Sequence, residues 1–160
     1  MYFMLKEYVQ AESDYRKAIE IDSESAIAHN YYGMLLFDQL KYPESMQQFE
    51  TAIRLFPQYG DALCNLGSAY GVIGQSEMEL AMQDSTHVQN HMQQSQKNFE
   101  TAIGYFNESI RVQSDYIEPY RMLTEIYRMT GDLENTDKYA GLTQQLEKRQ
   151  KKKNVSNLPE

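Results

Sequence analysis

Residues 26–59, AIAHNYYGMLLFDQLKYPESMQQFETAIRLFPQY, decide the fold. They predict two helices, about Ala26–Leu40 and Pro43–Leu55, separated by a tight turn. Pro43 falls in the first turn of the second helix, where its missing N–H costs nothing, and Pro57 ends that helix. A helix pair of this size cannot bury both of its apolar faces by itself, so copies of it are expected elsewhere in the chain.

Both helices recur along the chain in one register. Gly67 follows Gly33 after 34 residues, and both glycines lie where two helices can approach closely. The first-helix pattern returns in GDALCNLGSAYGVIG at 60–74 and in IEPYRMLTEIYRMTG at 117–131. The second-helix pattern returns in YRKAI at 15–19 and in FNESI at 106–110. The chain is therefore predicted to be a stack of helix pairs.

This pattern resembles the tetratricopeptide repeat family over most of residues 1–147. The residues that carry the resemblance are Ala52, Pro57, Leu66, Gly67, Tyr70, Gly74, Leu123, Tyr127 and Gly131. The sequence departs from the family at Ser45 and Thr136, which replace a small alanine, and at Thr124, which replaces glycine. The resemblance implies an all-α fold, a right-handed α-solenoid of helix–turn–helix repeats.

The expected units are a truncated unit 1–25, unit 26–59, unit 60–116 and unit 117–147, followed by a basic tail, 148–160, that we expect to be disordered. In the first unit, Met1 to Leu5 is expected to be the last turn of one helix, and a second helix is expected from about Val9 to Asp22. The apolar residues at this end do not form a polar cap. We therefore expect a fragment of a longer array, or another surface that covers this end.

The third unit carries an insertion. Gly33 and Ala52 are 19 residues apart in the second unit, whereas Gly67 and the equivalent Ser109 are 42 apart in the third. The difference is 23 residues, about 75–97, and these contain neither proline nor glycine.

An apolar stripe in and after this insertion predicts one long helix from about Thr86 to Val112, with Asp84 or Ser85 as its N-cap. Residues 76–82 are expected to form a separate short helix. We expect residues 76–98 to pack as a helical hairpin, or to contact a partner or a second copy through Val88 and Met92. A homo-oligomer is compatible with this expectation.

The net charge of the chain is −8, and it is unevenly distributed. The chain has 15 basic and 23 acidic residues, of which residues 148–160 contain five and one, so residues 1–147 carry 10 and 22, a net charge of −12. Such an acidic body argues against nucleic-acid binding, which needs basic surface to neutralise phosphates. The basic tail is where membrane contact is expected, if there is any.

The sequence favours a cytoplasmic location. Cys64 is the only cysteine, which excludes an internal disulfide framework and suits a reducing compartment. No apolar run approaches the roughly 18 residues that span a bilayer, and the apolar run at the N-terminus is too short for a secretory signal.

No residue pattern indicates an enzyme or a cofactor. His87 and His91 lie four residues apart, a spacing that can hold a metal on a helix, but no third ligand accompanies them. We interpret them as part of a solvated helix face, so no metal site is predicted. The sequence contains no phosphate-binding loop, nucleophile elbow or paired-carboxylate signature.

In the tetratricopeptide repeat family, the first helices of successive units line a concave groove that binds a peptide or helix of a partner protein. Carried over by position, the groove residues are Asn30, Met34, Phe37, Asp38, Asp61, Cys64, Asn65, Ser68, Val72, Glu118, Arg121, Glu125 and Arg128. Arg121 and Arg128 are expected either to bind an acidic group of a partner or to pair with Glu118 and Glu125. The chaperone-tail clamp of one subfamily is not expected, because Met34 and Glu118 stand where it needs Asn and Lys.

The sequence therefore predicts a non-catalytic scaffold for protein–protein interaction that binds a peptide or helix in its groove. Two alternatives remain open. One is an accessory domain of a larger enzyme, such as a membrane glycosyltransferase. The other is a structural subunit of a large assembly, in which the insertion docks on a neighbour.

Overall fold

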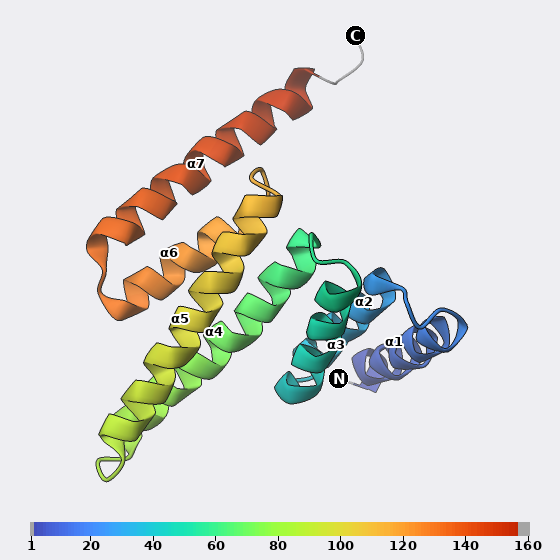
Figure 1. Ribbon diagram of the computed structural model, residues 1–160, viewed down its shortest axis with the longest axis horizontal. Helices are drawn as coiled ribbons and strands as arrows, with labels where there is room; N and C mark the ends of the chain where they lie inside the picture. The colour runs from blue at the N-terminus through green and yellow to red at the C-terminus, as the bar shows by residue number, and fades with distance from the viewer. Residues whose placement is uncertain (1, 157–160) are drawn as a thin grey trace.

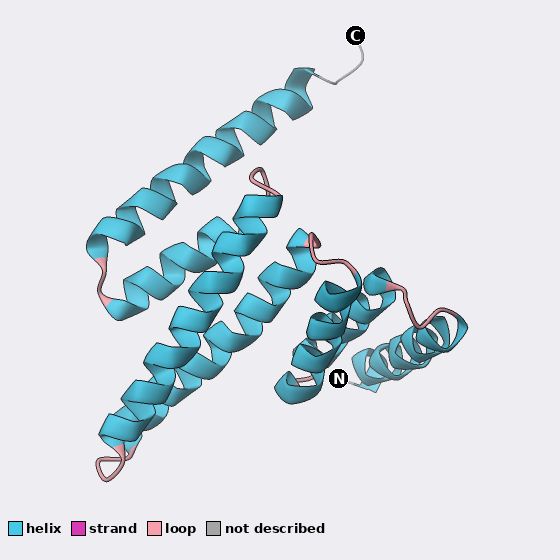
Figure 2. Ribbon diagram, in the orientation of Figure 1, coloured by secondary structure: helices cyan, strands magenta, loops and turns pink. Residues whose placement is uncertain are grey.

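The structure is a computed structural model that describes the backbone of residues 2–156 and the side chains of residues 8–153. The described part consists of seven helices joined by short loops, with no strand among them (Figures 1 and 2). The helices are α1 (Tyr2–Ile21), α2 (Ala26–Asp38), α3 (Tyr42–Leu55), α4 (Gly60–Gln83), α5 (Val88–Val112), α6 (Glu118–Thr130) and α7 (Leu133–Ser156).

Consecutive helices pack against each other, so the fold is a right-handed α-solenoid, as the sequence predicts. The pairs α2–α3, α4–α5 and α6–α7 are the helix pairs of the second, third and fourth repeats, and α1 packs against α2. The first helices of the repeats also contact one another, α2 with α4 and α4 with α6. These three helices together form one face of the solenoid.

Single residues define the ends of several of these helices. The Ser25 hydroxyl accepts a hydrogen bond from the Ala28 N–H and so caps α2. Pro43 lies in the first turn of α3. Gly131 ends α6 in the left-handed conformation, with φ of 78°, which glycine adopts at little cost.

Gly33 and Gly67 lie where the two helices of a repeat come closest, which confirms the prediction for both residues. A Cβ atom on Gly33 would lie 2.6 Å from Phe49 Cε1, and one on Gly67 would lie 2.9 Å from Phe106 Cε1. Both phenylalanines are buried. Each glycine therefore provides the space that the phenylalanine ring of the partner helix fills.

The 23 inserted residues lengthen both helices of the third repeat. The predicted separate helix over residues 76–82 is wrong, because α4 continues through Gly74 to Gln83. The two long helices form a hairpin that extends beyond the other helices (Figure 1). Small buried residues recur every seven positions along its seam: Gly60, Gly67, Gly74 and Ala81 on α4, and Ser95, Ala102 and Ser109 on α5.

This seam holds the hairpin together along its length. The Ser95 hydroxyl donates a hydrogen bond to the Gly74 carbonyl oxygen at 2.7 Å, and the Ser109 hydroxyl donates to the Gly60 carbonyl oxygen at 2.8 Å. A seven-residue repeat keeps the same face of two helices in contact over many turns. The hairpin is thus a continuous packed unit, and it extends the repeat without interrupting it.

The turn at the tip of the hairpin starts α5 at Val88, two residues later than predicted. Asp84 does not cap this helix. Its carboxylate accepts a hydrogen bond from the Thr86 N–H at 2.8 Å and lies 2.9 Å from His87 Nδ1. His87 occupies the N-cap position without a capping hydrogen bond from its side chain. Asp84 therefore stabilises the turn and does not cap α5.

The two outer helices are longer than the sequence predicts. The expected break between Leu5 and Val9 is wrong, because α1 is continuous and contains neither proline nor glycine that would end it. At the other end, α7 continues through the basic residues Lys148–Lys153 to Ser156, where a disordered tail was expected. Cations near a helix C-terminus are favoured by the helix dipole. The remaining part of the expected tail, 157–160, lies outside the described residues.

The core consists of local clusters, as is typical of a solenoid. One cluster joins α4, α5 and α6 through Cys64, Phe99, Ala102, Phe106, Leu123 and Ile126. A second joins α1 and α2 through Tyr32, Leu35 and Leu36, with Tyr15 and Ile19 packed against them. None of the described helices combines the length and the apolar character that crossing a membrane requires.

Candidate functional site

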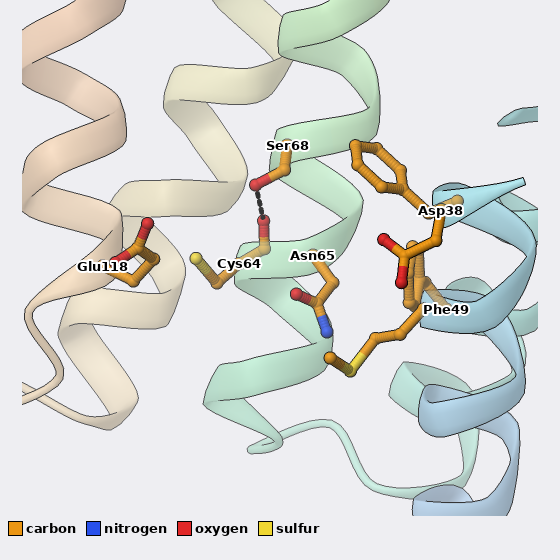
Figure 3. A pocket seen from close by; sticks show the side chains of 8 residues that line it. Asp38, Phe49, Cys64, Asn65, Ser68 and Glu118 are labelled. Atoms are coloured by element: carbon orange, nitrogen blue, oxygen red, sulfur yellow. Dashed lines mark hydrogen bonds between the residues drawn. The ribbon is translucent and has the colours of Figure 1, made fainter. Parts of the chain in front are cut away.

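Two adjoining cavities lie along the face formed by α2, α4 and α6. The polar cavity, about 180 Å³, is lined by Met34, Phe37, Asp38, Phe49, Cys64, Asn65, Ser68 and Glu118 (Figure 3). The apolar cavity, about 350 Å³, is lined by Phe37, Ser68, Gly71, Val72, Gln75, Phe106, Met122, Glu125, Ile126 and Met129. Phe37 and Ser68 line both cavities, so the two form one continuous groove across three repeats.

A chain of side-chain hydrogen bonds supports the floor of the polar cavity. Asn65 Nδ2 donates to Asn30 Oδ1 at 2.9 Å, and Asn30 Nδ2 donates to the Tyr59 hydroxyl at 3.4 Å. Asn30 is buried, whereas Asn65 is half-buried and lines the cavity. The side-chain carbonyl oxygen of Asn65 has no hydrogen-bond partner among the described residues, and it is available to accept one from a ligand.

Carboxylates from two different helices face this cavity. Asp38 is the last residue of α2 and Glu118 is the first residue of α6. Figure 3 shows them on opposite sides, with Cys64, Asn65 and Ser68 of α4 between them. No Lys, Arg or His is among the residues that line either cavity, and the apolar cavity adds Glu125. The groove is therefore acidic.

The cysteine in the groove is buried. Cys64 has a relative exposure of 1%, and burial raises the pKa of its thiol to about 12. Its neighbour Tyr116 also has a raised pKa, because burial disfavours the phenolate. A thiol with such a pKa stays protonated at neutral pH, and Cys64 contributes packing to the groove.

The arginines of α6 line neither groove cavity, and each is paired with a glutamate. Arg121 lies 3.4 Å from Glu118 and 2.6 Å from Glu147 of α7, and Arg128 lies 2.5 Å from Glu125. The hydrogen bond from Arg121 lowers the pKa of Glu147. Arg121 lines a separate cavity between α6 and α7. The alternative in which these arginines pair with neighbouring acids is the arrangement observed.

The structure brings most of the sequence-predicted groove residues together. Met34, Phe37, Asp38, Cys64, Asn65, Ser68 and Glu118 meet in the polar cavity, and Val72 and Glu125 line the apolar cavity. Asn30 lies behind Asn65, and Asp61 is half-buried outside both linings.

The apolar side of the groove on α6 was missed by sequence reasoning. It is formed by Met122, Ile126 and Met129, each one residue after a predicted groove residue. Their four- and three-residue spacing is a helical stripe, and this signal was visible in the sequence. This stripe faces the groove together with the predicted Glu118 and Glu125, whereas Arg121 and Arg128 line neither groove cavity.

The two histidines lie at the hairpin tip, away from the groove. His87 precedes α5 and pairs with Asp84, whereas His91 is half-buried, with its Nδ1 2.7 Å from a carboxylate oxygen of Glu77 on α4. They are therefore not a shared solvated face of one helix. Among the described residues, no three His, Cys, Asp or Glu side chains are grouped so that they could hold a metal ion.

Comparison with known proteins identifies the fold of this chain. No protein-family model matches the chain. Human "Tetratricopeptide repeat protein 13" is 29% identical over 70 residues, which are 44% of this chain and 8% of that protein. The structure of TTC0263, a thermophilic TPR protein of Thermus thermophilus, superposes with a TM-score of 0.69 over 92% of this chain and 70% of that chain, at 15% identity.

The chain has the tetratricopeptide-repeat fold. MamA from Desulfovibrio magneticus RS-1 agrees, with a TM-score of 0.66 over 91% of this chain and 70% of that chain, at 16% identity. PilF of Pseudomonas aeruginosa gives a TM-score of 0.61 over 83% of this chain and 50% of that chain, at 23% identity. The chain with this fold thus spans only 8% of the length of its human relative. It spans 70% of the MamA chain and 50% of the PilF chain.

Proposed function

We propose that this tetratricopeptide-repeat solenoid is a non-catalytic module that binds a segment of a partner protein, a peptide or a helix, along the groove of α2, α4 and α6. Proteins of this fold are in general scaffolds for protein–protein interaction. The observation that carries the proposal is the pair of adjoining cavities that crosses three repeats.

The chemistry of the groove suits recognition of a polypeptide. The apolar cavity offers Met122, Ile126 and Met129, and methionine packs against varied apolar side chains. The polar cavity offers the free carbonyl oxygen of Asn65, an acceptor for a backbone or side-chain N–H group of the ligand. Both kinds of contact lie within one groove, as an extended or helical segment requires.

The same residues do not favour catalysis. The Cys64 thiol is buried with a raised pKa, and neither cavity lining contains a histidine or lysine that could act as a base near it. We therefore assign Asp38 and Glu118 to binding and not to acid–base chemistry.

Site-specific photo-crosslinking tests the proposal. A photoreactive phenylalanine analogue is placed at Ser68, which lines both cavities, and separately at Gly104, an exposed position of α5 where an added Cβ meets nothing within 4 Å. The expected result is that one segment of one protein is crosslinked from position 68 and not from position 104. That segment is then synthesised and its affinity for the purified chain is measured by fluorescence anisotropy.

A matched pair of variants decides whether the groove binds the segment. Ser68→Arg fills the groove, whereas Ser76→Arg adds the same side chain at an exposed position of α4 outside both cavities. Ser68→Arg should weaken binding roughly tenfold or more, about 1.4 kcal/mol, and Ser76→Arg should leave it unchanged. Equal crosslinking from both positions, or full affinity in Ser68→Arg, would contradict the proposal.

A structural role in an assembly is the second candidate, and a feature of the hairpin tip favours it. Leu80, Met82, Val88 and Met92 are exposed there, Met82 with a relative exposure of 79%. These side chains cluster within one short stretch at the far end of the hairpin, where exposed apolar groups often mark a contact. In this candidate, Val88 and Met92 contact a neighbouring subunit.

A further inference from the structure

We propose that the ligand of this groove is a basic segment, in which an Arg or Lys side chain lies between Asp38 and Glu118 and a nearby apolar side chain enters the apolar cavity. This inference rests on the proposed function of the groove. It adds the chemical class of the partner, and it assigns the two carboxylates as the residues that select it.

Asp38 is the carboxylate that most needs a cation from outside. It is the last residue of α2, at the helix end where the dipole disfavours a negative charge. It forms no ion pair among the residues that the structure describes. Lys41, three positions along the chain, lies 4.0 Å from Glu12 instead. A cation of a partner would compensate both the charge of Asp38 and its unfavourable position.

Glu118 supplies the second carboxylate from the opposite side of the polar cavity (Figure 3). Its only ion pair among the described residues is with Arg121, at 3.4 Å, and both side chains are substantially exposed. Arg121 makes its closer contact with Glu147, at 2.6 Å. Arg121 can therefore remain bound to Glu147 while Glu118 accepts hydrogen bonds from a partner's cation.

The polar cavity matches a side-chain cation better than a metal ion. It presents two carboxylates and no third acidic or histidine ligand, and no grouping that could hold a metal is found in the described part of the chain. Its volume is about 180 Å³, and it is lined by acceptor groups that suit the end of an Arg or Lys side chain. The Asn65 carbonyl oxygen adds an uncharged acceptor between the two carboxylates.

The apolar cavity sets the second requirement on the ligand. It shares Phe37 and Ser68 with the polar cavity, so the two subsites are separated by the width of these side chains. Its only charged residue is Glu125, which pairs with Arg128 at 2.5 Å. An apolar side chain there and a cation beside it define the recognised pattern, and an acidic neighbour would be repelled by Asp38 and Glu118 of the polar cavity.

Peptide pools of defined composition test this inference. Three fluorescent pools share one apolar position and differ only in the flanking positions, which are Lys and Arg, Gln, or Asp and Glu. Fluorescence anisotropy against the full chain should show the Lys and Arg pool binding about tenfold more tightly than the Gln pool at low salt, and the Asp and Glu pool binding most weakly. The preference should shrink as salt is raised.

Two double variants of equal charge locate the preference. Asp38→Asn with Glu118→Gln removes both carboxylates of the groove, whereas Glu100→Gln with Glu134→Gln removes two exposed carboxylates that line neither cavity. The first pair should abolish the preference for the basic pool and the second should retain it. Circular dichroism confirms that both variants are folded.

The outcomes separate this inference from the proposed function. Equal binding of all three pools that is lost in Ser68→Arg would overturn the basic ligand and leave the groove as the binding site. Absence of binding by every pool, or binding that Ser68→Arg does not affect, would overturn both. A peptide of residues 148–156 serves as a further probe: if it alone binds, and the full chain associates with itself in sedimentation, the occupant is a second copy and not a partner protein.

Discussion

Gly67 shows how closely a single residue is constrained in this solenoid. A Cβ atom there would lie 2.9 Å from Phe106 Cε1 and 3.2 Å from the Ala102 carbonyl oxygen, and Phe106 has a relative exposure of 1%. The ring cannot move aside without disturbing the cluster that joins α4, α5 and α6. Gly104, on the same hairpin, has nothing within 4 Å of the position of its Cβ.

These two glycines give the first prediction. Gly67→Ala should lower the free energy of unfolding by about 1–3 kcal/mol, because the added methyl group overpacks the contact. Gly104→Ala should raise it by about 0.5–1 kcal/mol, because alanine restricts the unfolded chain and favours a helix. Urea unfolding followed by circular dichroism measures both. Equal effects of the two substitutions would contradict the close packing at Gly67.

The second prediction concerns the buried thiol of Cys64, whose pKa is raised to about 12 from an ordinary value of 9.0. The native state keeps this proton at pH values where the unfolded chain loses it. The free energy of unfolding should therefore fall as pH rises from about 9 to 12, by up to about 1.4 kcal/mol per pH unit from this group.

Cys64→Ala is the matched variant for this pH dependence. It should be less stable than the wild-type chain near neutral pH, because a methyl group leaves a small cavity, but its stability should fall less steeply than that of the wild-type chain above pH 9. The pKa of Tyr116 is raised mainly by burial and also by Cys64, so the difference between the two chains reports on this coupled pair. Identical slopes for the two proteins would show that the thiol does not titrate as described.

At the scale of the elements, the sequence predicted a helix boundary well where a residue at that boundary has a strong conformational preference. Pro43 marks such a boundary, and α2, α3 and α6 were predicted to within two residues. Gly74 resembles Gly131 in the repeat pattern, but it is helical and packs against Phe99. The residues after it are good helix formers, and Ala81 continues the seven-residue spacing of small residues, so α4 continues.

The candidate site was predictable to the extent that the register of the repeats is preserved. On α4 the predicted Cys64, Asn65 and Ser68 line the groove. On α6 the predicted Glu118 and Glu125 line the groove, whereas the apolar stripe that ends in Ile126 and Met129 lines it where Arg121 and Arg128 were expected. Which side chains of a helix face the groove depends on its packing against both neighbours, and a pattern within a single repeat does not encode that packing.

The hairpin gives the third prediction. Removal of residues 77–83 from α4 together with residues 88–94 from α5 shortens each arm by seven residues, keeps the turn at 84–87, and preserves the register of small residues. The shortened chain should fold cooperatively and should bind the groove ligand with unchanged affinity, because the cluster of α4, α5 and α6 is intact. Circular dichroism and thermal unfolding measure this. A chain that no longer folds would show that the tip belongs to the core.

Over the whole molecule, stability is expected to be distributed as in other solenoids, through contacts between neighbouring helices. The largest buried cluster joins α4, α5 and α6, whereas α1 packs against α2 and α7 packs mainly against α6. The outer helices therefore have fewer neighbours than the central hairpin. This arrangement also leaves the face of α2, α4 and α6 open along its length.

The fourth prediction follows from this distribution. Amide hydrogen exchange of the native chain should be slowest in α4 and α5 between residues 60 and 74 and between residues 98 and 112, and fastest in α1 and α7. Exchange measured by mass spectrometry with peptide-level resolution gives the order directly. Uniform protection across all seven described helices would indicate a single cooperative unit instead of a set of coupled repeats.

The central claim is that the groove of α2, α4 and α6 is the binding face, and the methionines of the chain test it most directly. Met34 lines the polar cavity and Met122 and Met129 line the apolar cavity, whereas Met46 lies on α3 and Met82 at the hairpin tip. Methyl-labelled methionine NMR, assigned by single Met→Leu variants, is recorded during titration with the crosslinked partner segment. The account predicts shifts at Met34, Met122 and Met129 and none at Met46 or Met82; shifts confined to Met82 and its hairpin neighbours would contradict it.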